Sequence, residues 1–511
     1  MDASYQRKLG SLIGYVYTIC QAVISIVYIP ILLHGIGDSE YGLYQILSSV
    51  IAYFAAMEAP LSASLLRYYS FYKEEGNQKK MENTLAIGRR MFVLFSIAFI
   101  IISIPTAFII KMVYAASLTP NELREALLMF GIMIVNLIIN LYGYTYIAAI
   151  TAFESFVFLK LSSLVTLIVQ PILVIWVIRK LPYAFVIVLI ATILSFALYW
   201  MRRYYAIHKL RVVIKYHEKD RELVFGIVKL SLSVLFVAIA DQIFWKTDQL
   251  ILGAICNTKT VSIYSIGSQI NSMFISVACV LGGMTLPMVT RVSTGADADQ
   301  KLSEMFTKIG RYQSYLVFLI LTGVILFGRE FIIILSGPEY LDTYYVALLL
   351  MIPYSVDLIQ TCAGSILQVK DKYYLRSIIL FIVAVINIAL TLLFTRKYGM
   401  IGAAMATTIS IIVSNVLLNI FYQKLIKLDI TLFWKKNIPI ILSSAVICGL
   451  GYFISCINIS NIYIAFAVHI FVYSVMYSVL MYSFVMNKQE KALIQSIIWK
   501  MVGRGKETRP C

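Results

Sequence analysis

The chain has 511 residues, of which 60% are hydrophobic and 14% are charged, and its mean hydropathy is +0.84. Soluble globular domains carry about 25% charged residues, so this composition excludes a water-soluble protein and the soluble enzyme classes. The 43 Lys and Arg residues outnumber the 26 Asp and Glu residues, which gives a net charge of +17. Basic residues gather in the cytoplasmic loops of membrane proteins and contact anionic lipid. The charge therefore needs no nucleic-acid partner, and none is expected.

The N-terminal segment predicts an uncleaved first transmembrane helix. Arg7 and Lys8 precede an apolar stretch of about 23 residues, which is longer than the core of a signal peptide and has no A-x-A cleavage site. Apolar runs of about 20 residues continue along the chain and predict an all-α integral membrane protein with about fourteen spans. The predicted spans are 10–33, 41–65, 90–110, 125–151, 157–178, 183–201, 223–245, 261–290, 312–335, 342–368, 375–395, 399–423, 437–456 and 461–486.

The distribution of basic residues gives these spans an orientation. With the N-terminus in the cytoplasm, roughly 33 of the 43 lysines and arginines fall on the cytoplasmic side and about nine fall outside. This asymmetry favours about fourteen spans with both termini cytoplasmic. The predicted outer loops are all short, so no separate soluble domain is expected.

A weak internal repeat appears at a shift of about 217 residues. Arg179-Lys180 corresponds to Arg396-Lys397, and Gln170 corresponds to Asn387. The repeat holds an even number of spans, so both copies enter the membrane from the same side. This predicts two pseudo-symmetric six-helix lobes around a central cavity, which is an architecture for transport by alternating access. The predicted parts are an N-terminal lobe (1–222), a C-terminal lobe (223–430), and two additional helices with a basic cytoplasmic tail (431–511).

Ionisable side chains inside spans are functional candidates, because lipid does not tolerate them without a partner or a cavity. In the second span Glu58 lies deep, Pro60 follows it, and Arg67 lies near the cytoplasmic end. At 100° per residue, Glu58 and Arg67 face opposite sides of a straight helix. In one interpretation Arg67 binds an anionic substrate and Glu58 has a gating or ion-coupling role. In the other, Arg67 extends to the lipid headgroups and Glu58 makes a structural hydrogen bond.

The end of the seventh span carries a wide polar face that should line water or a substrate path, unless its outer part lies in the membrane interface. Lys229, earlier in this span, is either a cavity cation or a residue that extends to the headgroups. The polar face consists of Asp241, Trp245 and Asp248 in one row and of Gln242, Lys246 and Gln249 beside it.

A second polar stripe follows the tenth span and includes Asp357 and Gln360, with Gly364 and Gln368 further along. Lipid would not accept such a stripe, so it should face the protein interior, either a cavity or a helix contact. Tyr264 belongs to a weaker stripe on the eighth span, for which hydrogen bonding between helices is the simpler interpretation.

Several chemistries lack their motifs in this sequence. The seven cysteines are scattered without C-x-x-C pairs, so neither a disulfide framework nor a zinc site is indicated. The sequence has no P-loop, no nucleophile elbow and no clustered histidines. We therefore expect no catalytic residues, metal or cofactor, and a protein that is not an enzyme.

Two segments resemble a known transporter family. The run 35–44, followed by Glu58-Ala59-Pro60-Leu61 and Leu65-Leu66-Arg67, resembles the L-G-x-x-x-Y-G-L-Y, D-x-G-L and L-x-R pattern of Wzx-type oligosaccharide flippases. Asp248-Gln249-Leu250-Ile251-Leu252-Gly253 with Tyr264 resembles their D-[RK]-x-x-L-G…Y segment. These flippases belong to the multidrug/oligosaccharidyl-lipid/polysaccharide exporter superfamily. Glu58, Pro60 and Gln249 depart from the usual Asp, Gly and basic residue of the pattern.

The resemblance implies a flippase that moves an undecaprenyl-diphosphate-linked oligosaccharide from the cytoplasmic to the outer leaflet of a bacterial inner membrane, for capsule or O-antigen assembly. It also implies a V-shaped pair of lobes, with membrane lipid, a polysaccharide polymerase and glycosyltransferases as candidate partners. A diphosphate requires cations, so the candidate substrate residues are Arg67, Lys229, Lys246, Gln249 and Tyr264. The candidates for gating, or for coupling to H⁺ or Na⁺, are Glu58, Asp241, Asp248, Asp357 and Gln360.

Two alternatives stay open at this point. A drug/cation antiporter of the same superfamily would favour an acidic cavity over a basic one. A membrane-embedded glycan polymerase or ligase would need a large outer loop, which the predicted topology lacks.

Overall fold

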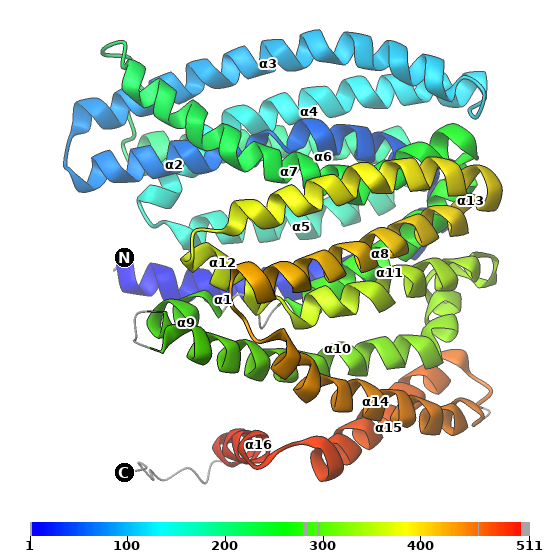
Figure 1. Cartoon of the computed structure of the whole chain (residues 1–511). Coiled ribbons are helices and arrows are strands. Elements are labelled where there is room, and N and C mark those ends of the chain that lie inside the picture. Colours follow the sequence, from blue (N-terminus) through cyan, green and yellow to red (C-terminus); the bar gives the residue numbers. More distant parts are fainter. Residues whose placement is uncertain (1–2, 280–284, 294–296, 458, 502–511) are drawn as a thin grey trace. The chain divides into compact units, whose positions relative to one another are not determined.

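The computed structural model describes residues 3–279, 285–293, 297–457 and 459–501, and within these ranges all regular structure is helical. Figure 1 shows the helices in chain order. In the first part of the chain they are α1 (Ala3–Ala55), α2 (Glu58–Glu74), α3 (Gln78–Tyr114), α4 (Pro120–Ala152), α5 (Phe156–Ile178), α6 (Ala184–Tyr204), the π-helix η1 (Tyr205–Lys209), α7 (Arg221–Ile255) and α8 (Thr258–Ala278). They continue with α9 (Thr285–Val292), α10 (Ala298–Ser336), the short 3₁₀ helix η3 (Pro338–Tyr340), α11 (Asp342–Ile359), α12 (Cys362–Val369), α13 (Tyr373–Leu425), α14 (Ile430–Ser455), α15 (Ile462–Leu480), the π-helix η4 (Met481–Val485) and α16 (Lys488–Met501).

The lengths of these helices make this a multi-pass membrane protein. Ten helical stretches among the described residues are long and apolar enough to cross a bilayer. Two of them, Leu9–Glu74 and Tyr373–Leu425, have 66 and 53 residues, and about 20 residues suffice for one crossing. The predicted spans lie mainly on helix, with turns at residues 56–57 of the second span and 360–361 of the tenth, and residues 280–284 of the eighth span lie outside the described residues. The prediction of an all-α membrane protein is confirmed.

Glycine allows both long stretches to turn back on themselves. Gly37 interrupts α1 with φ 82° and ψ 170°, and Gly399 interrupts α13 with φ 56° and ψ −135°. L-residues other than glycine essentially do not adopt the first of these conformations. Gly42 has a different role, since a Cβ there would lie 1.9 Å from the carbonyl oxygen of Thr258. Its missing side chain lets α1 approach the start of α8.

We expect Gly37→Ala to lower the free energy of unfolding by about 1–3 kcal/mol, because alanine would be held in a glycine-only conformation. Gly131→Ala in α4 is the matched control, since Gly131 is helical and a Cβ there meets open space. The control should be neutral or slightly stabilising. Thermal unfolding of the two purified variants measures the difference, and an equal effect of both would contradict the assigned role of Gly37.

The described residues pack into two compact units. Unit 1 comprises Met1–Gln269 and Leu380–Ser410, and unit 2 comprises Ile270–Ile379 and Ile411–Cys511. In unit 1, α1 packs on α4, α5 and α7, α2 packs on α4 and α7, and α3 runs beside α4, as Figure 1 also shows. In unit 2, α10 packs on α11, α14 and α15. The division into lobes 1–222 and 223–430 with an addition at 431–511 stays a prediction.

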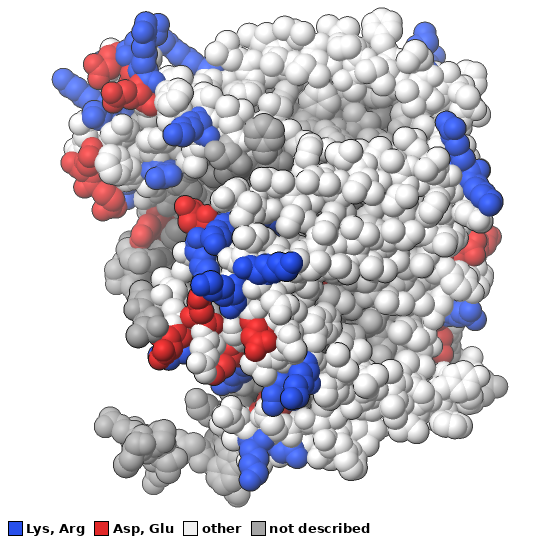
Figure 2. Space-filling model, in the orientation of Figure 1, with Lys and Arg blue, Asp and Glu red and all other residues white. Residues whose placement is uncertain are grey.

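The surface of each unit fits a lipid solvent. Large apolar side chains are widely exposed along the helices, for example Phe108 (70%) on α3 and Leu393 (65%) on α13. In Figure 2 the charged side chains lie toward helix ends, and the surface between them is made of other residues. A water-soluble protein rarely exposes contiguous apolar patches of this kind. The exposed apolar bands mark the faces that contact lipid.

Candidate functional site

A carboxylate and a pocket lined by both polar and apolar residues meet at the break between α1 and α2. The chain turns at residues 56–57, and α2 begins with Glu58, whose side chain is buried. The Tyr144 hydroxyl on α4 donates a hydrogen bond of 3.2 Å to Glu58 Oε2. Pro60, in the first turn of α2, has no N–H to leave unsatisfied, and its carbonyl accepts hydrogen bonds from Ser64 (2.9 Å) and Ser231 (3.4 Å). The proline thus starts a helix that carries Glu58 inward.

The pocket beside Glu58 has a volume of about 320 Å³, which is room for about ten water molecules. Asn140 donates to Asn136 (3.0 Å), and Asn136 donates to Ser195 (3.1 Å), so one wall is a chain of hydrogen-bonded amides. A pocket of this size suits water or a small cation rather than a lipid-linked sugar. Its polar lining residues are Tyr44, Ser48, Glu58, Asn136 and Asn140.

Asp248 is the most enclosed carboxylate of the predicted set, with 2% of its surface exposed. Three hydroxyl groups donate to it: Tyr264 on α8 at 2.5 Å, Thr407 on α13 at 2.6 Å and Thr391 on α13 at 3.0 Å. Asn387 in turn donates to the Thr407 hydroxyl at 3.0 Å. The carboxylate therefore joins α7, α8 and the 380–410 part of α13 within unit 1. The structure brings together the predicted pair of Asp248 and Tyr264.

The neighbours of Asp248 tie α7 to α1. The Gln249 side chain is buried and accepts a short hydrogen bond from the Ser49 hydroxyl. The Thr247 and Tyr53 hydroxyls lie 2.6 Å apart. Gln249 and Tyr264 thus hold helices together in this structure, with their polar atoms directed at protein groups.

The other candidate residues of α2 and α7 are more open. Arg67 is exposed on α2, Lys229 and Asp241 are exposed on α7, and Lys246 is half-buried. α2 and α7 pack against each other within unit 1. The three predicted cations therefore lie on two adjoining helices.

In unit 2 the predicted stripe of the tenth span has partners that the sequence did not indicate. The Arg376 guanidinium on α13 donates to Asp357 Oδ1 at 3.0 Å and to Oδ2 at 3.4 Å. Gln360 and Asn419 exchange side-chain hydrogen bonds at 2.9 and 3.3 Å, and the Trp434 indole N–H donates to Asn419 at 3.1 Å. Arg376 was not among the candidate residues predicted from the sequence. The available signal was its position inside the predicted span 375–395.

Within the described residues no group of three or more His, Cys, Asp or Glu side chains is arranged to hold a metal ion. Glu58, Asp248 and Asp357 each have their own hydroxyl or guanidinium partners. A single buried carboxylate can exchange a proton or hold a monovalent cation, and Glu58 is buried and lines a pocket.

Comparison with known proteins adds the family. Residues 10–293, more than half of the chain, match the family described as "Polysaccharide biosynthesis protein". A "Probable flippase AglR" from Haloferax volcanii is 27% identical over 177 residues, and the match covers 33% of this chain and 36% of that protein. The chain thus spans about a third of the length of this curated relative.

The fold likeness to solved structures covers more of the chain. A structure of the lipid II flippase MurJ in an inward closed conformation has a TM-score of 0.74 at 15% identity, and the match covers 97% of this chain and 99% of that one. An inward-facing multidrug resistance MATE family transporter of the MOP superfamily has a TM-score of 0.62 at 12% identity, covering 78% of this chain and 96% of that one. At these identities the likeness shows a shared transporter fold.

Proposed function

Because the chain belongs to the polysaccharide biosynthesis protein family and has a flippase-type transporter fold, we propose that it flips a polyprenyl-diphosphate-linked oligosaccharide from the cytoplasmic to the outer leaflet. One observation carries the choice of a flippase over a drug transporter. The flippase fold accounts for 97% of the chain, whereas the multidrug transporter fold accounts for 78%. The AglR match, with a protein described as a probable flippase, supports the same choice.

We place the diphosphate among the cations of unit 1. A diphosphate cannot enter hydrocarbon without counter-charges, and guanidinium groups bind phosphate through paired hydrogen bonds. Arg67 is exposed on α2, next to the helix that carries Lys229 and Lys246. Gln249 and Tyr264, which are buried in hydrogen bonds, then hold α7 in place rather than bind sugar.

Movement of the substrate leaves its bonds unchanged, so its energy comes from mass action or from an ion gradient. We propose Glu58 as the coupling carboxylate, since it is buried, lines a pocket and accepts a hydrogen bond from Tyr144. A proton or Na⁺ bound there would neutralise a buried charge that is otherwise expensive in a membrane. We propose supporting roles in gating or ion coupling for the other predicted candidates, Asp241, Asp248, Asp357 and Gln360. The proposed location is a bacterial cytoplasmic membrane with both termini cytoplasmic.

The test is transbilayer movement of a polyprenyl-diphosphate oligosaccharide in proteoliposomes. We expect movement that depends on the protein and falls at least about tenfold in Arg67→Ala, because one charge-assisted phosphate contact is worth roughly 1.5–3 kcal/mol. Arg124→Ala is the matched control, since Arg124 is also an exposed arginine near a helix end in unit 1.

Each outcome decides one part of the proposal. Equal movement in the two variants would keep the flippase and reject Arg67 as the diphosphate contact. No movement of several lipid-linked glycans, together with efflux of an organic cation, would replace the flippase with a drug antiporter. The fold likeness to multidrug transporters makes that antiporter the second candidate.

A further inference from the structure

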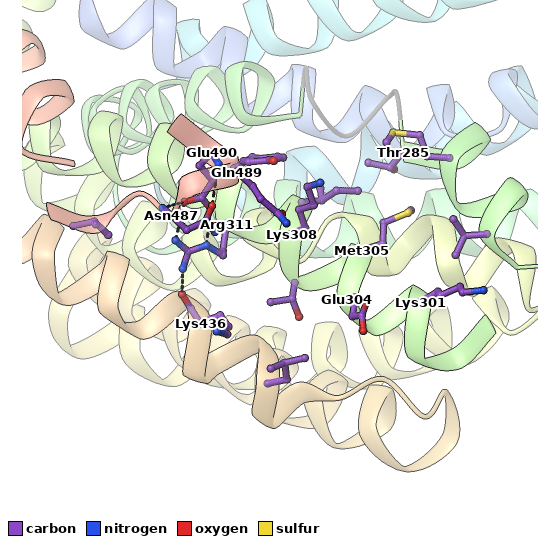
Figure 3. Close-up of a pocket in the computed structure, with 17 residues that line it drawn as sticks. Thr285, Lys301, Glu304, Met305, Lys308, Arg311, Lys436, Asn487, Gln489 and Glu490 are labelled. Carbon is purple, nitrogen blue, oxygen red and sulfur yellow. Dashed lines mark hydrogen bonds and ion pairs between the residues drawn. The ribbon is translucent and has the colours of Figure 1, made fainter. Parts of the chain in front are cut away.

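Unit 2 contains a pocket of about 980 Å³ that the proposed transport site does not use. It lies between α9, the first turns of α10, the start of α14 and the segment 485–490 that leads into α16 (Figure 3). Its lining combines apolar and charged side chains. The apolar part is Met288, Val292, Met305, Ile309, Leu432 and Val485.

A set of hydrogen bonds attaches the C-terminal segment to the pocket wall. Glu490 accepts from Arg311 Nε (2.7 Å) and Nη2 (3.0 Å), and from the Tyr315 hydroxyl (3.0 Å). Arg311 also donates to the Lys436 carbonyl oxygen at 2.5 Å, as Figure 3 shows. Asn487 and Glu490 form a reciprocal cap at the start of α16. These contacts give the pocket a fixed third wall.

Glu490 neutralises the charge of Arg311 in an ion pair. Burial raises the pKa of the Glu490 carboxyl, but the hydrogen bonds from Arg311 and the Asn487 backbone outweigh it and hold the pKa below its usual value. Glu490 is therefore ionised at neutral pH, and it neutralises Arg311 at 2.7 Å. The remaining charges of the pocket decide what it attracts.

Those remaining charges are mostly positive. Lys301, Lys308 and Lys436 line the pocket with exposed side chains, and Glu304 is the one further acid among the lining residues. Lys301 and Lys308 are seven residues apart, which places them on one face of α10, two turns from each other. Met305, between them on that face, adds apolar surface. The pocket thus offers lysine ammonium groups next to a place for a hydrocarbon chain.

We propose that this pocket binds an anionic phospholipid, with the lipid phosphate among Lys301, Lys308 and Lys436 and an acyl chain on the apolar lining. Basic pockets between transmembrane helices are known to take anionic headgroups. A free phosphate would use the lysines but leave the apolar lining empty, and a neutral lipid would do the reverse. By contacting α10, α14 and the C-terminal segment together, the lipid would stabilise unit 2. This proposal does not depend on which substrate the protein moves.

The test is thermal unfolding of the full chain in neutral detergent, titrated with phosphatidylglycerol or with phosphatidylcholine of the same acyl chains. We expect phosphatidylglycerol to raise the melting temperature of the native protein and phosphatidylcholine to have little effect. In a triple variant, Lys301→Gln, Lys308→Gln and Lys436→Gln, the concentration for half the effect should rise at least about tenfold. The matched control is Lys79→Gln, Lys209→Gln and Lys219→Gln, which removes three exposed lysines of unit 1 and should respond like the native protein.

Four results would overturn the proposal. The lysine triple variant and its control could respond alike, or phosphatidylcholine could stabilise as well as phosphatidylglycerol. Inorganic phosphate alone could reproduce the effect, which would leave the acyl chain without a role. A polyprenyl diphosphate could bind this pocket in preference to phosphatidylglycerol, which would make it a substrate site. Loss of lipid stabilisation with unchanged flipping would separate this site from the proposed transport site.

Discussion

Replacing Asp248 with alanine is expected to lower the free energy of unfolding by about 3 kcal/mol or more. Three buried hydroxyl groups, on Tyr264, Thr391 and Thr407, donate to this one carboxylate. Without it each must find another acceptor where no water reaches, and an unsatisfied buried polar group costs about 1–3 kcal/mol. The two threonines can turn to the carbonyl one helical turn back, which limits the loss. Thermal or denaturant unfolding of the purified protein measures it.

Two comparisons separate packing from chemistry at this position. Asp248→Asn should be milder, since its carbonyl can accept from Tyr264 and Thr407 while its amide donates to Thr391. Asp342→Ala is the control, because Asp342 is exposed in the first turn of α11 and loses only about 0.3–1 kcal/mol of helix-dipole stabilisation. A loss in Asp248→Ala no larger than that of Asp342→Ala would contradict the structural role. An asparagine variant that is stable but does not flip would point instead to ion coupling at Asp248.

The spans were predictable because lipid imposes a simple rule on sequence. A bilayer core about 30 Å thick requires about 20 consecutive apolar residues in a helix, and apolar runs of this length recur along the chain. Gly37 falls between two predicted spans and Gly399 is the first residue of the twelfth, and at both turning points glycine adopts conformations that other residues rarely take. The all-helical, membrane-spanning character of the chain therefore follows from periodicity and length alone.

Contacts between helices were less predictable, because residues distant in sequence supply them. Asp357 was singled out as a candidate, but its partner Arg376 was not. Gly42 was noted only as part of a motif. The structure shows why a side chain does not fit there, since the carbonyl of Thr258, 216 positions along the chain, packs against it. A polar stripe on one helix shows that something polar faces it. It does not show whether that is a cavity or another helix.

The candidate site illustrates the same limit. Sequence reasoning grouped Gln249 and Tyr264 with the cations, since all of them belong to polar rows or family motifs. The structure places the first against Ser49 and the second against Asp248, both buried. Gln249 and Tyr264 are buried whereas Arg67 is exposed, and this difference depends on how the helices pack. Glu58 was predicted to be either a coupling group or a structural one, and the pocket beside it is why we propose the first.

Glu58→Gln is expected to remove any dependence of transport on an ion gradient and to slow gradient-driven flipping at least about tenfold. Glutamine has nearly the same shape, and its carbonyl oxygen can still accept from the Tyr144 hydroxyl, now at 3.2 Å from Glu58 Oε2. It cannot gain or lose a proton, and it offers Na⁺ no negative charge. The free energy of unfolding should therefore change by less than about 1 kcal/mol while coupling is lost.

The measurement is flipping in proteoliposomes with and without an imposed proton or Na⁺ gradient, for the native protein, Glu58→Gln and Glu74→Gln. Glu74 is the matched control, because it is an exposed glutamate at the other end of the same helix. We expect the gradient to accelerate the native protein and the control but not Glu58→Gln. If Glu58→Gln retains the full acceleration, the coupling group lies elsewhere and Glu58 serves only to join α2 to α4. If no gradient accelerates the native protein, transport runs on mass action alone, and Glu58 is not a coupling group.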